Sequence, residues 1–473
     1  MSFESNTDIS QSGARQEERI EGRTLYVNIP GHDPFSVERF GGNVRDNRAL
    51  SSDMHLPQYT LEDKDSRLPG PGLDRVGGAP TGQAVDTSRS QFFVSPNGND
   101  HNSGSADQPW QTIQKGAKSA TPGSVVNVMP GEYRGQVNVT VSGNERDGFV
   151  TFRSTVPGGA VLNLSGERGG GNETAGFKIQ NRNYIEVSGF EIKNLKGTNS
   201  DSTPNGVLIS GGSSHIRLTG LDIHHIENNI NRKSNAHGIS VYGDGKDAAS
   251  ASRDIVIANN KLHDLKLGAS EAIVINGNVE NFTIANNRLT RLNNIGIDVA
   301  GFEGTSRGAL DQPRQGIISG NYLSDIDSRG NPAYGGARAA GGIYVDGGTR
   351  VTISGNTVER ANIGIELASE HKGRTTSSVT VSGNLLKHNT MSGISLGGAE
   401  RTNGGATGNL IENNRLIEND TDRTGSGEIA FQNFVTNTTI RGNKLVSGGV
   451  FISNEARIAD SNKIYDNQMS GPS

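Results

Sequence analysis

Apolar residues along most of the chain stand in short runs in which they alternate with polar residues, and the runs recur at intervals of roughly 24–39 residues. The recurring unit reads apolar-x-x-Asn-x-apolar, and residues 257–262 are its first clear copy. Later copies occupy residues 284–289, 318–323, 353–358, 381–386, 411–416, 440–445 and 464–469. Alternation gives each strand an inner and an outer face, and the interval suits one three-stranded coil with one variable loop. The pattern predicts an all-β fold, a single-stranded right-handed parallel β-helix (a solenoid), over residues 91–473.

The asparagine of the repeat has a structural explanation. A coil must turn sharply at its corners, and asparagine and glycine tolerate the left-handed backbone conformation that such corners need. Asparagine side chains stacked from coil to coil can also hydrogen-bond along a corner. We therefore expect these residues to stabilise the solenoid, and we assign them no chemistry.

The sequence before the repeats has a different character. Residues 1–90 are polar and interrupted by proline and glycine, which predicts a mostly disordered leader with one short apolar patch at residues 25–29. A short helix is expected over residues 109–120, because Trp110, Ile113, Ala117 and Ala120 would share one helical face. Such a helix would cap the open end of the solenoid.

Composition narrows the class of protein. The 65 glycines and the hydrophobic share of 32% indicate a thin core with many tight turns. A formal charge of −5 argues against nucleic acid as a partner, and the absence of cysteine excludes disulfides and thiolate metal sites. No apolar run is long enough to cross a membrane, and the first residues lack the features of a Sec-type signal peptide. We expect a secreted protein that uses type III-like or other export, although a cytoplasmic location also fits the sequence.

Three segments near residue 100 carry a resemblance to known proteins. They read FFVSPNGND at residues 92–100, QPWQTIQK at 108–115, and PGSVVNV followed by PGEY within 122–133. Together they resemble the opening coils of the pectate-lyase-like right-handed β-helix superfamily, especially its polysaccharide lyase family 9-like branch. That superfamily includes lyases, glycosidases, uronate epimerases, phage tailspikes and binding proteins, so the resemblance implies the fold and a polysaccharide ligand. No stretch matches a catalytic signature of one lyase family, and no active-site residue is carried over.

A column of acidic residues is the main candidate for chemistry. The middle coils can be aligned on their Gly-Ile pairs, which begin at positions 238, 296, 342, 364 and 393. In this alignment Asp298, Asp346 and Glu366 lie on three successive coils of one exposed face. Neighbouring members should be about 8 Å apart at the backbone, from coil and strand spacings of ~4.8 and ~6.6 Å. Carboxylates so close together need a cation, a shared proton or a substrate. We therefore predict that this trio is catalytic and that it binds Ca²⁺.

Other residues are expected to complete this site. Lys372 is the candidate catalytic base, and the loop at residues 327–340 would wall one side of a groove. The predicted substrate-binding residues are Asn276, Glu303, Tyr334, Arg338, Tyr344, Glu370, His371 and Gln432. Glu271 and Glu428 would extend the same face, with uncertain register. The histidines at positions 224, 225, 237 and 263 show no paired ligand spacing, so we expect core or surface histidines there and not a metal site.

Three functions are compatible with these features. The first is a lyase that cleaves an acidic, uronate-containing polysaccharide by β-elimination, with calcium offsetting the uronate charge and Lys372 removing the proton. The second is an inverting glycoside hydrolase that uses the Asp298, Asp346 and Glu366 cluster as acid and base. The third is a non-catalytic polysaccharide-binding or tailspike-like module. The lyase is the first expectation.

Overall fold

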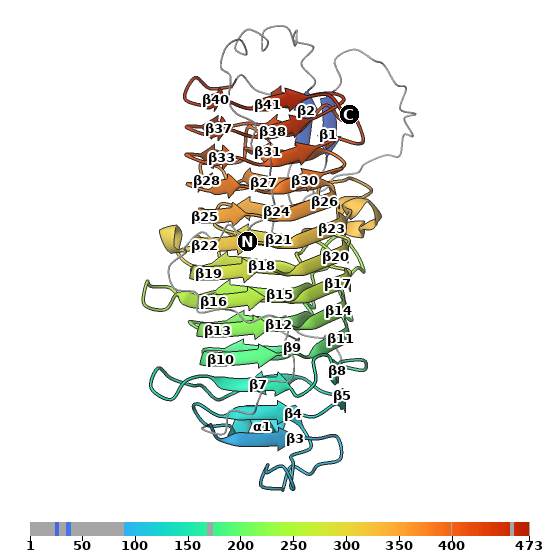
Figure 1. Ribbon diagram of the computed structural model, residues 1–473, viewed down its shortest axis with the longest axis vertical. Coiled ribbons are helices and arrows are strands. Elements are labelled where there is room, and N and C mark those ends of the chain that lie inside the picture. Colours follow the sequence, from blue (N-terminus) through green and yellow to red (C-terminus); the bar gives the residue numbers. More distant parts are fainter. Residues whose placement is uncertain are drawn as a thin grey trace, which may run out of the picture.

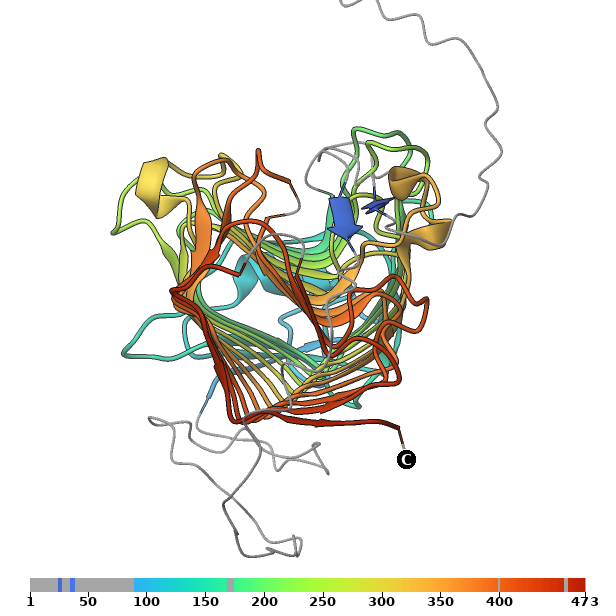
Figure 2. The ribbon, with the colours of Figure 1, turned by 90° about the horizontal axis from the view of Figure 1, so that it is seen from above.

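The chain from Gln91 onwards winds into a solenoid of three parallel sheets (Figure 1). The computed structural model describes residues 24–27, 35–38, 89–167, 174–398, 400–454 and 458–472. Seen from above, the coils superpose, and the longer loops project from two corners on the same side (Figure 2). The predicted β-helix is therefore confirmed. Most of the predicted leader lies outside the described residues. In the part of it that is described, β1 (Thr24–Val27) pairs antiparallel with β2 (Phe35–Glu38).

Each full coil contributes to all three sheets, and three of the later coils contribute two short strands to sheet 1 in place of one. Sheet 1 consists of β3 (Gln91–Val94), β4 (Val125–Val128), β7 (Val150–Ser154), β10 (Asn183–Ser188), β13 (Ser214–Thr219), β16 (Ser252–Ala258), β19 (Val279–Ala285), β22 (Arg314–Ser319), β25 (Thr349–Ser354), β28 (Thr375–Ser377), β29 (Thr380–Ser382), β32 (Gly405–Thr407), β33 (Leu410–Glu412), β36 (Val435–Thr436), β37 (Thr439–Arg441) and β40 (Lys463–Tyr465). Sheet 2 consists of β5 (Gly131–Tyr133), β8 (Ala160–Asn163), β11 (Glu191–Lys196), β14 (Asp222–Glu227), β17 (Lys261–Leu265), β20 (Arg288–Leu292), β23 (Tyr322–Ile326), β26 (Thr357–Ala361), β30 (Leu385–Lys387), β34 (Arg415–Ile417), β38 (Lys444–Val446) and β41 (Gln468–Ser470). Sheet 3, which carries the candidate site, consists of β6 (Val137–Val139), β9 (Ala175–Gln180), β12 (Asn205–Ser210), β15 (His237–Gly243), β18 (Ile273–Gly277), β21 (Ile297–Ala300), β24 (Gly341–Asp346), β27 (Ile363–Ala368), β31 (Ser392–Leu396), β35 (Ile429–Phe431) and β39 (Ile452–Asn454).

The core is a stack of inward-pointing apolar side chains. Ile297, Ile343 and Ile365 pair in register on successive coils and are fully buried. The glycine before each isoleucine leaves room for packing: a Cβ on Gly342 would lie 2.4 Å from Cγ1 of Val358. The Gly-Ile pairs therefore mark one corner position of each coil, which explains why they align the sequence correctly.

A ladder of hydrogen-bonded asparagines runs along one corner of the solenoid. Each side-chain amide Nδ2 donates to the Oδ1 of the asparagine on the next coil, at 2.9–3.0 Å. The ladder consists of Asn260, Asn287, Asn321, Asn356, Asn384, Asn414, Asn443 and Asn467. The left-handed conformation falls on the preceding residue, such as Asn259 or Gly320. The repeat asparagine is thus selected for its side-chain hydrogen bonds, and its neighbour makes the turn.

The position of an asparagine along the ladder predicts how far its substitution lowers the free energy of unfolding. Asn356 accepts from the backbone and side chain of Asn321 and donates to Ile318 O and Asn384 Oδ1. Asn356→Ala would leave these buried partners unsatisfied, and we expect it to lower the free energy of unfolding by about 2–4 kcal/mol. Asn467→Ala, at the less buried C-terminal end of the ladder, should cost clearly less. Urea denaturation of both variants tests this, and equal losses would show that the ladder position is unimportant.

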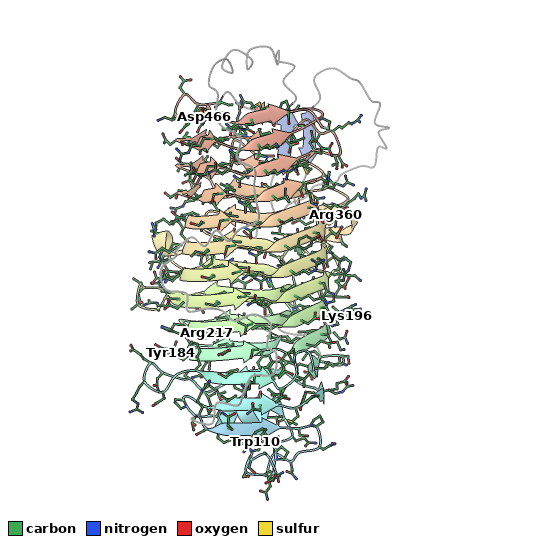
Figure 3. All side chains as sticks on the ribbon, in the orientation of Figure 1. Trp110, Tyr184, Lys196, Arg217, Arg360 and Asp466 are labelled. Carbon is green, nitrogen blue, oxygen red and sulfur yellow. The ribbon has the colours of Figure 1, made fainter. Side chains whose placement is uncertain are left out.

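The N-terminal end of the solenoid is capped as predicted. Helix α1 (Ile113–Ser119) begins after Thr112, whose side chain accepts a hydrogen bond from the Lys115 backbone N–H. All four predicted apolar positions are buried, although Trp110 forms a β-bridge with Val94 and stacks on Phe92 at 4.8 Å. Trp110 lies at one end of the molecule and Asp466 at the other (Figure 3). Among the described residues, no helix is long and apolar enough to cross a membrane.

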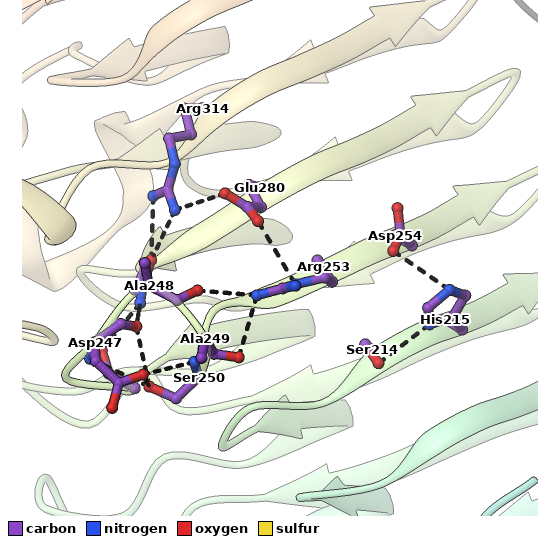
Figure 4. Close-up of polar contacts among 12 residues, drawn as sticks. Ser214, His215, Asp247, Ala248, Ala249, Ser250, Arg253, Asp254, Glu280 and Arg314 are labelled. Atoms are coloured by element: carbon purple, nitrogen blue, oxygen red, sulfur yellow. Dashed lines mark hydrogen bonds and ion pairs between the residues drawn. The ribbon is translucent and has the colours of Figure 1, made fainter. Parts of the chain in front are cut away.

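A polar network holds the loop that follows β15. Arg253 donates to the carbonyls of Ala248 and Ala249, and the Ser250 and Asp247 side chains bond each other at 2.8 Å (Figure 4). In addition, Ser306 Oγ donates to Gly245 O at 2.5 Å. The loop after β15 therefore contacts the loop after β21, which supplies part of the candidate site.

Candidate functional site

A deep acidic pocket of about 390 Å³ lies on the outer face of sheet 3. Strands β15, β18, β21, β24 and β27 form its floor. Its lining includes six carboxylates: Glu271, Asp298, Glu303, Asp346, Glu366 and Glu370. Among the described lining residues there is no lysine and no arginine. The pocket therefore concentrates carboxyl groups on a protein of modest net charge.

The predicted register of the acidic trio is correct, but the predicted exposure is wrong. Asp298 pairs with Tyr344, which pairs with Glu366, and Asp346 pairs with Ala368. These residues thus occupy two adjacent outward columns on three successive coils. However, Asp298, Asp346 and Glu366 are only 5%, 2% and 9% exposed. The loops at both edges of sheet 3 rise around them, so the carboxylates lie at the bottom of a pocket and not on a flat face.

Two loops on opposite edges of sheet 3 form the walls. The loop before β24 contains the short 3₁₀ helices η3 (Ser328–Gly330) and η4 (Pro332–Tyr334), and it brings Tyr334 into the pocket. Asn331 anchors this loop by donating from Nδ2 to the carbonyls of Gly268 and Asn293. On the other edge, the loop after β21, which includes η2 (Gly308–Leu310), contributes Glu303.

Eight of the predicted site residues meet in this pocket. They are Asn276, Asp298, Glu303, Tyr334, Tyr344, Asp346, Glu366 and Glu370. His371 lies just outside the lining and contacts Glu303, with 2.7 Å between Nε2 and Oε1.

The other three predicted residues lie away from the lining. Lys372 is exposed, and Arg338 forms ion pairs with Asp327 and Asp422. Gln432 is buried two coils beyond Ala368, and its amide Oε1 and Nε2 have no hydrogen-bond partner among the described residues. Neither Lys372 nor Arg338 is placed to act on a ligand at the pocket floor.

Three further lining residues, His237, Tyr242 and Glu271, come from earlier coils. His237, predicted as a core or surface histidine, is buried beneath the pocket, where Nδ1 donates to Glu271 O at 3.1 Å and Nε2 lies 3.0 Å from the Tyr242 hydroxyl. Burial lowers the pKa of His237 to about 4, so the ring is neutral. Glu271 does extend the site, whereas Glu428 is buried outside the lining and accepts from Asn419. A signal existed for Tyr242, because it shares the second outward column with Asn276.

Burial and mutual repulsion keep several of the pocket acids protonated. Burial, and next the Glu370 charge, raise the pKa of Glu366 and of Glu271 to about 8. Burial and neighbouring carboxylates also raise the pKa of Asp298 and of Asp346 well above the usual range. At neutral pH the pocket therefore holds carboxylic acids that can donate protons.

Glu370 is the carboxylate that raises the pKa of all four buried acids. Glu370→Gln should lower these four pKa values, so the high-pH limb of any activity profile should move toward lower pH, by up to about one pH unit. The high-pH limb of such a profile marks the pH range in which the catalytic acid loses its proton. A profile of kcat/KM against pH tests this. Glu412→Gln, outside the pocket on sheet 1, is the control, and an unmoved limb in Glu370→Gln would contradict the expectation.

One oxygen of the pocket floor has no protein partner. Asp298 Oδ1 is buried and lacks a hydrogen-bond partner among the described residues. A buried polar atom of this kind is costly unless a proton, a water molecule or a ligand satisfies it. Asp298 lines the pocket, so a bound ligand can supply the missing partner.

The pocket also contains a set of groups able to hold a cation. Ligand atoms of Glu303, Asp346 and His371 all lie within 4.8 Å of one another. Only Asp346 of the predicted calcium ligands belongs to this set. Two carboxylates suit a hard cation such as Ca²⁺, whereas an imidazole is not a ligand that Ca²⁺ prefers.

The fold defines a right-handed parallel β-helix protein. The family model "Right handed beta helix region" matches residues 309–434, which confirms the predicted resemblance. A second model, described as "Protein of unknown function (DUF1565)", matches residues 96–334. The chain belongs to this DUF1565 family. It is similar to the uncharacterized protein YwoF of Bacillus subtilis (strain 168), with 36% identity over 378 residues, 80% of this chain and 79% of YwoF.

Solved structures with a similar fold include carbohydrate-active enzymes of more than one kind. The GH136 lacto-N-biosidase from Eubacterium ramulus aligns with a TM-score of 0.56 and 14% identity, over 81% of this chain and 68% of that enzyme. The alginate lyase from Paenibacillus sp. str. FPU-7 aligns with a TM-score of 0.47 and 16% identity, over 76% and 96%. At these identities the likeness concerns the fold alone.

Proposed function

We propose that the chain is a glycoside hydrolase that binds an uncharged sugar in the pocket of sheet 3. The observation that carries this proposal is a buried carboxyl group, Glu366, whose pKa is raised to about 8, beside further acids on the adjacent coils. Glycosidases use two carboxyl groups on either side of the scissile bond, and one must be protonated at working pH.

Glu366 and Asp346 are assigned complementary roles. Glu366, protonated at neutral pH, donates its proton to the leaving oxygen of the glycosidic bond. Burial and the Glu370 charge raise the pKa of Asp346, and the hydrogen bond of 2.9 Å that its Oδ1 accepts from the Glu370 backbone N–H opposes this rise. Asp346, in its ionised form, acts as the base or the nucleophile on the sugar. The two backbones are about 8 Å apart from the strand and coil spacings, which allows a sugar ring between the side chains.

The charge of the pocket supports an uncharged substrate. A uronate would enter a site with six carboxylates and, among the described lining residues, no lysine or arginine. A buried uronate without a cationic partner is destabilised by the loss of its hydration where the carboxyl groups are protonated, and also by charge repulsion where they are ionised. By contrast, neutral sugars need hydrogen-bond partners and an apolar platform, which the carboxyl groups, Tyr334 and Tyr344 provide.

A cation-assisted lyase is the second candidate function. The observation in its favour is the Glu303, Asp346 and His371 set, which would hold Ca²⁺ beside the pocket and offset the charge of a uronate. Its base would have to be a pocket residue, because Lys372 lies outside the lining. The mixed nitrogen and oxygen donors and the lack of a cationic side chain at the floor make this the weaker candidate.

The reaction products separate these functions. The full chain is incubated with neutral and uronate-containing oligosaccharides, with and without calcium, and products are followed by new reducing ends and by near-ultraviolet absorbance. We expect reducing ends from a neutral substrate, no ultraviolet-absorbing product and no calcium requirement. A calcium-dependent, ultraviolet-absorbing product from a uronate polymer would establish the lyase and overturn the hydrolase. No product from any substrate would support a binding module.

A further inference from the structure

A second cluster of polar side chains lies on the outer face of sheet 2, away from the acidic pocket of sheet 3. It is centred on β14 and β17, where His224 and His263 are direct neighbours in the parallel register. Asp222 precedes His224 in the same outward row, and Glu191 pairs with Asp222 from β11. Residues from three successive coils thus meet in one place that the proposed hydrolase does not use.

The geometry of this cluster matches a metal site. The two imidazole rings are stacked, with centroids 4.9 Å apart and an interplanar angle of 15°. Ligand atoms of Asp222, His224 and His263 all lie within 4.8 Å of one another. Nε2 of His263 is 2.9 Å from Asp222 Oδ1, and Nε2 of His224 is 3.1 Å from Glu191 Oε1. Both rings therefore turn the same nitrogen, Nε2, toward a carboxylate.

The surroundings of His263 give an independent indication. Its other nitrogen, Nδ1, lies 2.5 Å from Asp264 Oδ2, and Arg291 holds that carboxylate with two bonds of 2.6 and 2.7 Å. Metal-binding histidines commonly donate their second ring nitrogen to a carboxylate in this way, which fixes the ring and its tautomer. With the ring proton on Nδ1, the lone pair of Nε2 faces Asp222 Oδ1 at 2.9 Å, and a cation can bind between the two groups.

Neighbouring cations leave the inner ligand atom of Asp222 accessible. Lys261 pairs with the other oxygen of Asp222, Oδ2, at 2.9 Å, so Oδ1 remains directed at His263. By contrast, Lys193 pairs with Glu191 Oε1 at 2.5 Å, the same oxygen that faces His224. Asp222 is consequently the better carboxylate ligand, and Glu191 can act as a fourth ligand only in competition with Lys193.

We propose that His224, His263 and Asp222 form a binding site for a divalent transition-metal ion, with Zn²⁺ as the best match. Two imidazole nitrogens and a carboxylate oxygen are ordinary zinc ligands, and Zn²⁺ binds three or four of them. The ion would link β14 to β17, two coils whose histidines are 39 residues apart in sequence. The ion would have a structural role in the solenoid, and its site is separate from the acidic pocket of sheet 3.

Zinc and cobalt titrations of the chelator-treated full chain test the proposal. We expect calorimetry to detect Zn²⁺ binding and Co²⁺ to give the visible absorption bands of a low-symmetry site with nitrogen ligands. Both signals should vanish in the His224→Ala and His263→Ala variants. Asp264→Asn should weaken binding by about 10–100-fold, because it removes the partner that orients His263. Zn²⁺ should also raise the melting temperature of the wild type and not of His263→Ala.

The matched control is His371→Ala, which removes the only histidine of the pocket's own cation-binding set. Because that set can itself hold a metal, the His224→Ala and His263→Ala comparison is repeated in the His371→Ala background, which should retain the zinc and cobalt signals of the sheet 2 site. Signals that persist in this background after both sheet 2 histidines are replaced, or that disappear in His371→Ala alone, would overturn the assignment, as would a wild type that binds neither metal. If a histidine variant fails to fold, Asp222→Asn gives the same comparison with a smaller change.

Discussion

Glu366→Gln is expected to lower kcat/KM for glycosidic-bond cleavage by about 10²–10⁴-fold, the usual contribution of a general acid. The substitution keeps the shape of the side chain but removes the proton donor at the floor of the pocket. Asp346→Asn should cause a loss of similar size, because it removes the carboxylate that acts on the opposite side of the sugar. KM should change far less than kcat, since both substitutions preserve most of the contacts with the ground-state substrate.

Ser395→Ala is the matched control for this experiment. Ser395 pairs with Glu366 on the next coil of the same outward column, yet it does not line the pocket. Its removal should leave kcat and KM close to the wild-type values. Near-normal turnover in both Glu366→Gln and Asp346→Asn would show that the reaction does not use these two groups, and the assignment of the acid and the base would then fail.

The buried acids should also make stability fall as pH rises. The pKa of Glu366 is about 8 in the folded chain, against a usual value of 4.5. Below about pH 4.5 the group is protonated in both folded and unfolded states and costs nothing. Above that pH the unfolded chain releases the proton more readily, so stability decreases until about pH 8, by a total on the order of 5 kcal/mol.

Glu366→Gln should remove this part of the pH dependence. We expect the variant to unfold at a higher temperature than the wild type at pH 8 and at the same temperature at pH 4, in calorimetric melts. Glu412→Gln removes a carboxylate that pairs with Arg441 outside the pocket, and it should not raise the melting temperature at pH 8. Parallel curves of melting temperature against pH for the wild type and Glu366→Gln would mean that the pKa of Glu366 is not raised in the folded state.

The sequence predicts the fold and the columns of the site well, because both depend on periodicity. The asparagine repeat fixes the coil length, and the Gly-Ile pairs fix the register of β21, β24 and β27. Asp298, Asp346 and Glu366 were therefore placed correctly relative to one another. Their burial was not predicted, since it depends on loops such as the one that brings in Tyr334, and loops follow no period.

The positions of Lys372 and Arg338 away from the pocket have the same origin. Lys372 and Arg338 lie in loops, where no alternation tells which way a side chain points, and Arg338 is drawn to Asp327 and Asp422. The expectation of no metal site at the histidines rests on the absence of a paired spacing. In a solenoid, however, the relevant spacing is one whole coil, and residues as distant as His224 and His263 become nearest neighbours.

The asparagine ladder also determines how this molecule can change in length. Successive ladder residues are between 24 and 35 positions apart, yet every step has the same hydrogen bond. A loop can therefore lengthen or shorten without disturbing the corner, whereas an insertion inside the repeat unit itself would break two steps of the ladder. Duplication of one whole coil adds one asparagine and restores both neighbours. We therefore expect the solenoid to lengthen by duplication of whole coils, and new pockets to arise by insertions in the loops, which leave the coils unchanged.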